Sequence, residues 1–202
     1  MPAPEPGERW GILGGAFDPI HLGHLALARD VKRLRPLDRI LFVPTFEPPH
    51  RSVQPVASFE DRCVMTRLAI EDQADMAASR IEERTSRPSF TLDTVQALKI
   101  AHPGVEFELV IGADQLGLLS TWHCWRDLID EVRLIVGNRP GTDITQVILL
   151  NPNRIIVLDT ALMDVSSTEI RARLAAGARM DELSAMLPPG VAKYIESRNL
   201  YR

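Results

Sequence analysis

Short apolar runs recur along the chain, and each is followed by a polar turn or by a segment with helical periodicity. Runs of this length, bounded by turn-forming residues, predict buried β-strands. We expect strands at residues 10–13, 39–43, 107–111, 132–136 and 155–158, and a weaker one at residues 78–84. A strand, a helix and a second strand in succession imply a right-handed crossover and parallel pairing.

The segments between these runs carry the periodicity of helices. Leu27, Val31 and Leu34 recur at i, i+4 and i+7, which predicts that they form the buried face of a first helix. Ser58 and Ser166 are each followed three residues later by an acidic residue, a pattern that begins helices. Further helical segments are expected from Ser58, with Val64, Met65 and Leu68 facing inward, over residues 90–102, over residues 116–125, from Ser166, and from Pro188 with Val191, Tyr194 and Ile195 facing inward.

Alternating strands and helices predict an α/β fold: a single Rossmann-like, doubly wound and mainly parallel sheet with helices on both faces. Residues 1–9 are expected to form a flexible tail, and residues 10–202 one domain whose part from residue 165 onward is helical. Residues 44–57, with prolines at 44, 48, 49 and 55, show neither the periodicity of a helix nor that of a strand. A loop this long is usually a lid, a binding loop or disordered.

Composition narrows the functional classes. With 202 residues, 45% hydrophobic and 25% charged, the chain is an ordinary globular protein with one core. Its 23 basic and 27 acidic residues give a net charge of −4, which does not favour nucleic acid. Two cysteines, Cys63 and Cys124, are too few for a disulfide framework. No apolar run suits a membrane span or a signal peptide, so we expect a cytoplasmic protein.

The stretch from Gly14 to Leu25 carries the most distinctive chemistry. Paired glycines interrupt a strand and lead into a helix, whose first N–H groups and positive dipole end form an anion site. His21 and His24 project from one face of that first turn. The glycines could equally make a tight turn, and the histidines could be surface residues. Zinc ligation is disfavoured because the sequence offers no suitable Cys or His partners.

A second candidate anion site begins at Ser166. Residues 166–169 read most simply as a capping box, but the same hydroxyl and N–H groups would also cradle an anion, with Arg171 on the next turn. Trp122 follows a strand end marked by Gly112 and Asp114, where α/β sheets bind ligands. Taken alone, Trp122 is more often a core aromatic, and Arg139 a solvated charge.

Together, the two stretches resemble the H-x-G-H nucleotidyltransferases, and within them the bacterial nicotinate-nucleotide adenylyltransferases. Residues 14–25 resemble the phosphate loop of that family and residues 165–171 its second signature. The segments similar to the nicotinate-nucleotide pattern are residues 48–51, 89–94, 112–116, Thr121–Trp122 with Trp125, and 191–201. Many relatives have Thr or Ser where this chain has Ala16, so one hydroxyl donor to phosphate is missing.

The resemblance implies adenylyl transfer from ATP to nicotinate mononucleotide, giving nicotinate adenine dinucleotide and pyrophosphate, with Mg²⁺ carried on the ATP phosphates and no dedicated metal site. Its implied catalytic residues are His21, His24 and Arg171. Its implied ATP-binding residues are Gly14, Gly15, Ala16, Gly23, Gly112, Asp114, Ser166, Ser167 and Ile170. Its implied acceptor-binding residues are Phe17, Asp18, Pro49, His50, Thr91, Trp122 and Arg139.

Other functions remain open at this point. Nicotinamide mononucleotide or phosphopantetheine as acceptor, or cytidylyl transfer, would reuse the same phosphate loop, and a non-catalytic nucleotide-binding module would bind ATP without releasing pyrophosphate. A class I aminoacyl-tRNA synthetase is excluded because the chain is too short and residues 166–171 contain no lysine. We expect no nucleic-acid or membrane partner; a homo-oligomer is compatible with the sequence.

Overall fold

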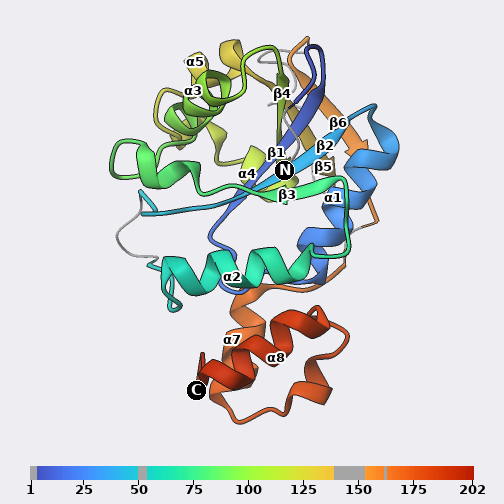
Figure 1. The fold of residues 1–202 in the computed structure, drawn as a ribbon, viewed down its shortest axis with the longest axis vertical. Coiled ribbons are helices and arrows are strands. Elements are labelled where there is room, and N and C mark those ends of the chain that lie inside the picture. The colour runs from blue at the N-terminus through green and yellow to red at the C-terminus, as the bar shows by residue number, and fades with distance from the viewer. Residues whose placement is uncertain (1–3, 50–53, 139–152, 162) are drawn as a thin grey trace.

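A computed structural model describes residues 4–49, 54–138, 153–161 and 163–202. Its centre is a six-stranded sheet in which every paired neighbour is parallel, in the order β3-β2-β1-β4-β5-β6 (Figure 1). This order confirms the predicted doubly wound fold. The strands are β1 (Arg9–Gly15), β2 (Arg39–Pro44), β3 (Met76–Ala78), β4 (Glu106–Gly112), β5 (Arg133–Asn138) and β6 (Ile155–Asp159).

Helices cover both faces of the sheet and enclose two hydrophobic clusters. One cluster joins the sheet to α1 (Leu22–Leu34), α2 (Phe59–Ala69), α7 (Ser167–Ala175) and α8 (Pro189–Arg198). The other joins it to α3 (Thr91–Ala101), α4 (Ala113–Leu116) and α5 (Trp125–Glu131). Helices α7 and α8 lie together at one end of the molecule, beyond α2 and one end of α1 (Figure 1).

Strand residues alternate between the two clusters, as the pleat of a sheet requires. On β1, Trp10 and Ile12 belong to the α3–α5 side, whereas Leu13 belongs to the α1 side. On β2, Ile40 and Phe42 belong to the α1 side. These side chains are at most 4% exposed, so both faces of the central strands are buried. This explains why the strands appear in the sequence as short continuous apolar runs.

Strands β1 and β4 are neighbours although they are far apart in the chain, so the strand order reverses between them. The chain proceeds from β1 outward to β2 and β3 on one side, and from β4 outward to β5 and β6 on the other. The carboxyl ends of β1 and β4 are Gly15 and Gly112. A crevice beyond such a reversal is where doubly wound sheets bind ligands.

Several local predictions were wrong. Residues 78–84 are not one strand, because β3 ends at Ala78 and Ile81–Arg84 is a 3₁₀ turn. Residues 116–125 do not form one helix: a 3₁₀ turn at Leu119–Thr121 separates α4 from α5, and Cys124 has a left-handed backbone (φ 49°). Leu34 is 40% exposed, unlike the buried Leu27 and Val31.

The buried face of α2 also differs from the prediction. Met65 is buried as expected, but Val64 and Leu68 are only half-buried. The helix instead buries Arg62, together with Cys63 and Thr66. A buried guanidinium contradicts simple hydrophobic periodicity and needs polar partners.

At the amino-terminal end, Arg9 is already the first residue of β1. The Gly7 N–H donates to the Gly104 carbonyl at 2.9 Å, so part of the segment expected as a tail is hydrogen-bonded to the domain. No helix among the described residues has the length and apolar character that a membrane crossing requires.

Candidate active site

A cavity of about 420 Å³ lies at the carboxyl ends of β1 and β4. It brings together residues from both signatures, which are separated by about 140 positions in the sequence. Of the residues implied for ATP binding or catalysis, the lining includes Gly14, Gly15, Ala16, His21, Gly23, His24, Gly112, Asp114, Ser166 and Ser167. Trp122 also lines it, and the lining residues that the sequence analysis did not assign to the site are Leu13, Leu27, Val110, Ile111, Gln115, Met163 and Val165.

The two histidines face this cavity from the start of α1, and their hydrogen bonding sets one tautomer. The His24 Nδ1 atom accepts a hydrogen bond from the His21 backbone N–H at 3.2 Å. A neutral imidazole that accepts at Nδ1 carries its proton on Nε2. His24 therefore has an Nε2–H donor, and the backbone of the phosphate loop holds the ring in place.

Burial keeps both rings neutral. The His21 and His24 rings stack with centroids 3.7 Å apart, and His21 is 6% exposed. Burial lowers the pKa of His21 from 6.5 to about 4. Burial, and then the charge of His21, lower the pKa of His24 well below its usual value. The His21 Nδ1 atom is buried and has no hydrogen-bond partner among the described residues. The atom is covered by protein and faces Gly23 at the start of α1.

Two glycines of the phosphate loop have different physical roles. A Cβ on Gly23 would lie 3.0 Å from His21 Nδ1, so a larger residue would displace the imidazole. A Cβ on Gly14 would meet nothing within 4 Å, and Gly14 lines the cavity. Gly23 therefore allows the ring to pack against the helix, whereas Gly14 leaves room for a ligand.

The second signature forms the start of α7. Ser166 is the N-cap, and its Oγ accepts from the Glu169 N–H at 3.1 Å, which is half of the expected capping box. The Glu169 carboxylate instead pairs with Arg173 at 2.7 Å. Because Ser166 Oγ acts as an acceptor here, its O–H can still donate. The N–H groups of Ser167 and Thr168 lie in the first turn of α7, where the helix offers them no carbonyl acceptor. They can therefore donate to a ligand at the positive end of the helix.

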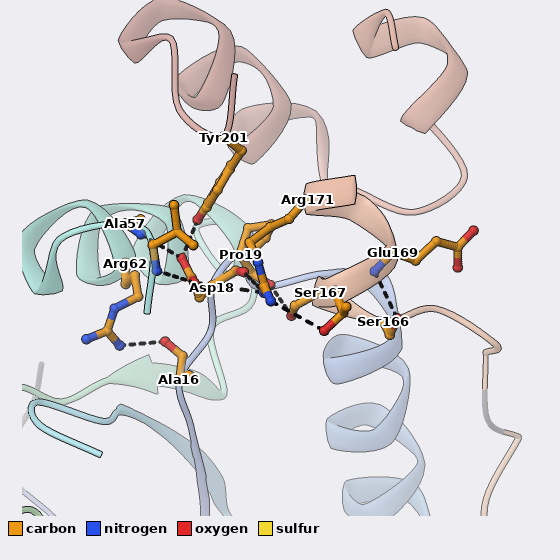
Figure 2. A network of polar contacts seen from close by, with 12 residues as sticks. Ala16, Asp18, Pro19, Ala57, Arg62, Ser166, Ser167, Glu169, Arg171 and Tyr201 are labelled. Carbon is orange, nitrogen blue, oxygen red and sulfur yellow. Dashed lines mark hydrogen bonds and ion pairs between the residues drawn. The ribbon is translucent and has the colours of Figure 1, made fainter. Parts of the chain in front are cut away.

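The two signatures are joined behind the cavity (Figure 2). The Ser167 hydroxyl donates to the Pro19 carbonyl at 2.9 Å. The Arg171 guanidinium donates from Nη1 to the Asp18 carbonyl at 2.7 Å and from Nη2 to Thr168 Oγ1 at 3.3 Å. Arg171 does not line the cavity. It holds the phosphate loop against α7 in this structure.

Asp18, implied by the resemblance to contact the acceptor, lies outside the cavity lining and is 4% exposed. Its carboxylate accepts from the N–H groups of Val56 and Ala57 at 2.7 and 3.0 Å and from the Tyr201 hydroxyl at 2.8 Å. Arg171 Nη1 is 3.8 Å from the same carboxylate. Protein donors therefore occupy both oxygens, and direct ligand contact by this carboxylate is not supported.

Arg62 is a structural residue of the site that the sequence analysis missed. Its guanidinium, 1% exposed, donates to the Ala16 carbonyl at 2.5 Å and to the Thr45 carbonyl at 2.7 Å. These carbonyls follow β1 and β2, so Arg62 links the phosphate loop to the start of the proline-rich segment. Burial lowers its pKa, which nearby Asp18 and Glu82 counteract. In the sequence, only the excess of polar residues on the inner face of α2 indicates that Arg62 is buried.

The remaining predicted residues that the structure describes lie apart from the cavity lining. The Ile170 side chain is fully buried in the core, and Phe17 is 2% exposed and packs edge-on against His24 with centroids 5.0 Å apart. Pro49 is exposed. Thr91 begins α3, directly after Phe90, whose ring stacks on His123 at 4.1 Å, next to Trp122. His50 and Arg139 are outside the described residues.

The sequence model of the cytidylyltransferase-like family matches residues 12–173. A "Probable nicotinate-nucleotide adenylyltransferase" of Symbiobacterium thermophilum is 39% identical over 96% of this chain and 95% of its own length. One of Gloeobacter violaceus is 40% identical over 96% and 97%. The chain belongs to the nicotinate-nucleotide adenylyltransferase family.

Solved structures share the fold. A Plasmodium falciparum nicotinic acid mononucleotide adenylyltransferase complexed with NaAD superposes with a TM-score of 0.80, covering 96% of this chain and 97% of its own, at 21% identity. The same enzyme complexed with APC gives a TM-score of 0.78. These matches confirm the Rossmann-like architecture expected for the family.

Proposed function

We propose that the chain transfers the adenylyl group of ATP to nicotinate mononucleotide, producing nicotinate adenine dinucleotide and pyrophosphate. The observation that carries this proposal is the meeting of both signatures on one cavity: His24 and the start of α7 line it together. The names of the full-length relatives support the same reaction and its place in NAD biosynthesis.

The chemistry requires positioning more than proton transfer. The 5′-phosphate of the acceptor attacks the α-phosphorus of ATP, a P–O bond to the acceptor forms, and the P–O bond to pyrophosphate breaks. The attacking phosphate oxygen is already anionic at neutral pH, so no protein base is needed. Orientation of two bound reactants can supply roughly 7–11 kcal/mol of the barrier, and a donor directed at the developing charge about 3–4 kcal/mol.

On the ATP side, we assign the Nε2–H of His24 as a donor to the phosphates at the reacting centre, with His21 beside it. The Ser166 hydroxyl and the N–H groups of Ser167 and Thr168 would hold the leaving pyrophosphate, since they lie at the positive end of α7. Arg171 would stabilise that group only after its guanidinium leaves the Asp18 carbonyl. The glycine-lined wall, Gly112 and Asp114 would border the nucleoside of ATP.

On the acceptor side, Trp122, an aromatic side chain in the cavity lining, would stack on the pyridine ring. Thr91 and neighbouring backbone donors would read the carboxylate of nicotinate. The Phe90–His123 stack supports this assignment because it joins the segments carrying Thr91 and Trp122. Phe17, Pro49, His50 and Arg139 remain proposed acceptor contacts, with Phe17 acting through its packing on His24.

Mg²⁺ is the metal that accompanies ATP, and the residues present fit a phosphate-borne ion. Among the described residues, no three His, Cys, Asp or Glu side chains form a potential metal site. Because Mg²⁺ usually keeps several waters and binds substrate phosphates, it needs few protein ligands, and Asp114 is the carboxylate in the described lining. The ion would neutralise phosphate charge. A cytoplasmic location and a homo-oligomeric state also remain proposals.

One assay tests the function. Purified protein with Mg²⁺ and ATP is offered nicotinate mononucleotide, nicotinamide mononucleotide or phosphopantetheine in turn while pyrophosphate release is followed. We expect the highest kcat/KM with nicotinate mononucleotide. Preference for another acceptor would reassign the substrate, and ATP binding without pyrophosphate release from any acceptor would indicate a non-catalytic nucleotide-binding module.

A further inference from the structure

Four segments of the chain converge on one buried carboxylate behind the phosphate loop (Figure 2). Asp18 belongs to the loop itself, Val56 and Ala57 precede α2, Arg171 lies on α7, and Tyr201 follows α8. The Tyr201 ring is 9% exposed, and burial together with Asp18 raises the pKa of its hydroxyl, so that it stays protonated and donates. The bond joins residues 183 positions apart.

The anchored carboxylate is connected to the reacting centre by a short path. Asp18 follows Phe17, which has a left-handed backbone (φ 50°) and packs edge-on against the His24 ring. Backbone strain of this kind persists only where the surroundings hold it. On the other side of Asp18, the Pro19 carbonyl accepts from Ser167 of the second signature. Movement of Asp18 would therefore change the position of His24 relative to α7.

We propose that Tyr201 is a positioning residue of the active site: its hydroxyl, through the Asp18 carboxylate, fixes the phosphate loop and hence His24 relative to the start of α7. This inference rests on the function proposed above. Tyr201 contacts neither the cavity nor, by inference, the substrates, so its effect on the reaction is entirely one of geometry. Without the hydroxyl, Asp18 Oδ1 keeps only the Ala57 N–H, in a position that is almost closed to water.

The molecule offers a matched control in the same region. The Tyr194 hydroxyl, on α8, donates to the Asp61 carboxylate of α2 at 2.9 Å. Both bonds join a tyrosine near residue 200 to an aspartate, and both Phe substitutions remove a single oxygen. Asp61 lies on α2 and not on the phosphate loop, so Tyr194→Phe removes an equivalent bond without disturbing the path to His24.

The first readout is catalytic. We expect Tyr201→Phe to lower kcat about tenfold, since a displacement of about 1 Å can cost about 100-fold, and to change the KM for ATP less than kcat. We expect Tyr194→Phe to keep the wild-type kcat. The thermal midpoint of Tyr201→Phe should fall further than that of Tyr194→Phe, because Asp18 is buried and Asp61 is half-exposed, so kcat is measured well below both midpoints to separate positioning from lost stability. Equal kcat values for both variants would overturn the proposal.

A second readout does not depend on turnover. In ¹⁵N-histidine-labelled protein, Tyr201→Phe should shift the ring resonances of His24 and His21 while leaving His102 unchanged, and Tyr194→Phe should shift none of them. Unmoved His24 resonances would overturn the positioning role. If the wild-type protein released no pyrophosphate from ATP and nicotinate mononucleotide, the proposed function would fail, whereas this comparison would still decide the role of Tyr201.

Discussion

The two sides of the phosphate loop differ in their polar groups. We call the side that lines the cavity with His21, His24 and the start of α7 the front, and the side around the Asp18 carboxylate the back. On the front, the buried His21 Nδ1 lacks a partner among the described residues, and the start of α7 presents N–H groups without in-helix acceptors. On the back, a few residues away, the Asp18 carboxylate receives three hydrogen bonds from protein donors and lies near a guanidinium. Exposure differs as well, since Ser166 and Thr168 at the start of α7 are exposed, whereas Asp18 is 4% exposed.

The contrast indicates how the site prepares for a polyanion. A ligand gains most from donors that are already desolvated and unpaired, because no protein bond must break first. The buried His21 Nδ1 destabilises the ligand-free loop, since an unpaired buried polar atom costs about 1–3 kcal/mol. The saturated carboxylate on the back holds the loop in place despite this cost. Changes on the front should therefore affect turnover, and changes on the back should affect stability and positioning.

The sharpest test of the front is His24→Ala. Removing an aligned donor from developing charge should lower kcat roughly 10²–10³-fold, while the chain stays folded because His24 belongs to neither hydrophobic cluster. Steady-state pyrophosphate release and thermal denaturation measure the two effects. Turnover close to that of the wild type would remove His24 from the mechanism.

Because burial keeps the His21 ring neutral, the free energy of unfolding should depend on pH. The pKa of His21 is about 4 in the folded protein and 6.5 without burial, so between these values the unfolded chain binds more protons. Stability should be fully present above pH 6.5 and fall as the pH falls toward 4, by on the order of 3 kcal/mol. Urea unfolding at pH 7 and pH 5 measures the slope. His21→Gln should flatten it, and an equal slope in that variant would contradict the assignment.

The back is tested by Asp18→Asn. An amide has a single acceptor oxygen, so its NH₂ group would face either the Val56 N–H or the pair of donors from Ala57 and Tyr201. We expect a loss of about 1–3 kcal/mol and a fall in the thermal midpoint of roughly 2–4 °C per kcal/mol. Asp61→Asn, at a half-exposed carboxylate, is the control and should lose less. Equal losses of stability in Asp18→Asn and Asp61→Asn would show that the buried Asp18 carboxylate stabilises the protein no more than the half-exposed Asp61 does.

The smallest effect on stability is expected for Gly14→Ala. A Cβ there meets nothing within 4 Å, so the free energy of unfolding should stay within about 0.5 kcal/mol of the wild type. The methyl group would occupy the cavity and should raise the KM for ATP severalfold. Gly23→Ala sharpens the comparison, because its methyl would press on the His21 ring and lower kcat. A large loss of stability in Gly14→Ala would mean that other atoms pack against Gly14 and that the cavity does not extend to it.

The fold was largely predictable because its central strands are buried on both faces, which leaves continuous apolar runs in the sequence. The errors arose where polar groups are buried. Arg62 lies inside because two main-chain carbonyls accept its protons. Glu82, within the segment wrongly predicted as strand, is 6% exposed because its carboxylate accepts from the Phe46 N–H and the Thr94 hydroxyl. Such partners are distant in sequence, so no local pattern indicates them.

The same limit applies to the site. Its front could be predicted, since glycines, histidines and serines at short spacing form the motifs that the cavity unites. Its back could not: Asp18 lies within the motif, but the sequence does not reveal that its partners are residues 56, 57 and 201. Arg171 was assigned to phosphate, whereas its guanidinium is bound to a loop carbonyl. A motif therefore identifies the chemistry more reliably than the role of each residue.

The long separation between Asp18 and Tyr201 bears on how the protein is made. After a ribosome incorporates Asp18, it adds 183 further residues before the hydroxyl that completes the anchor exists. Throughout that interval the nascent loop already carries both histidines but lacks its support from behind. A loop without this support should turn over more slowly than one that has it, so the rate that the two histidines can reach depends on one of the last residues to be joined to them.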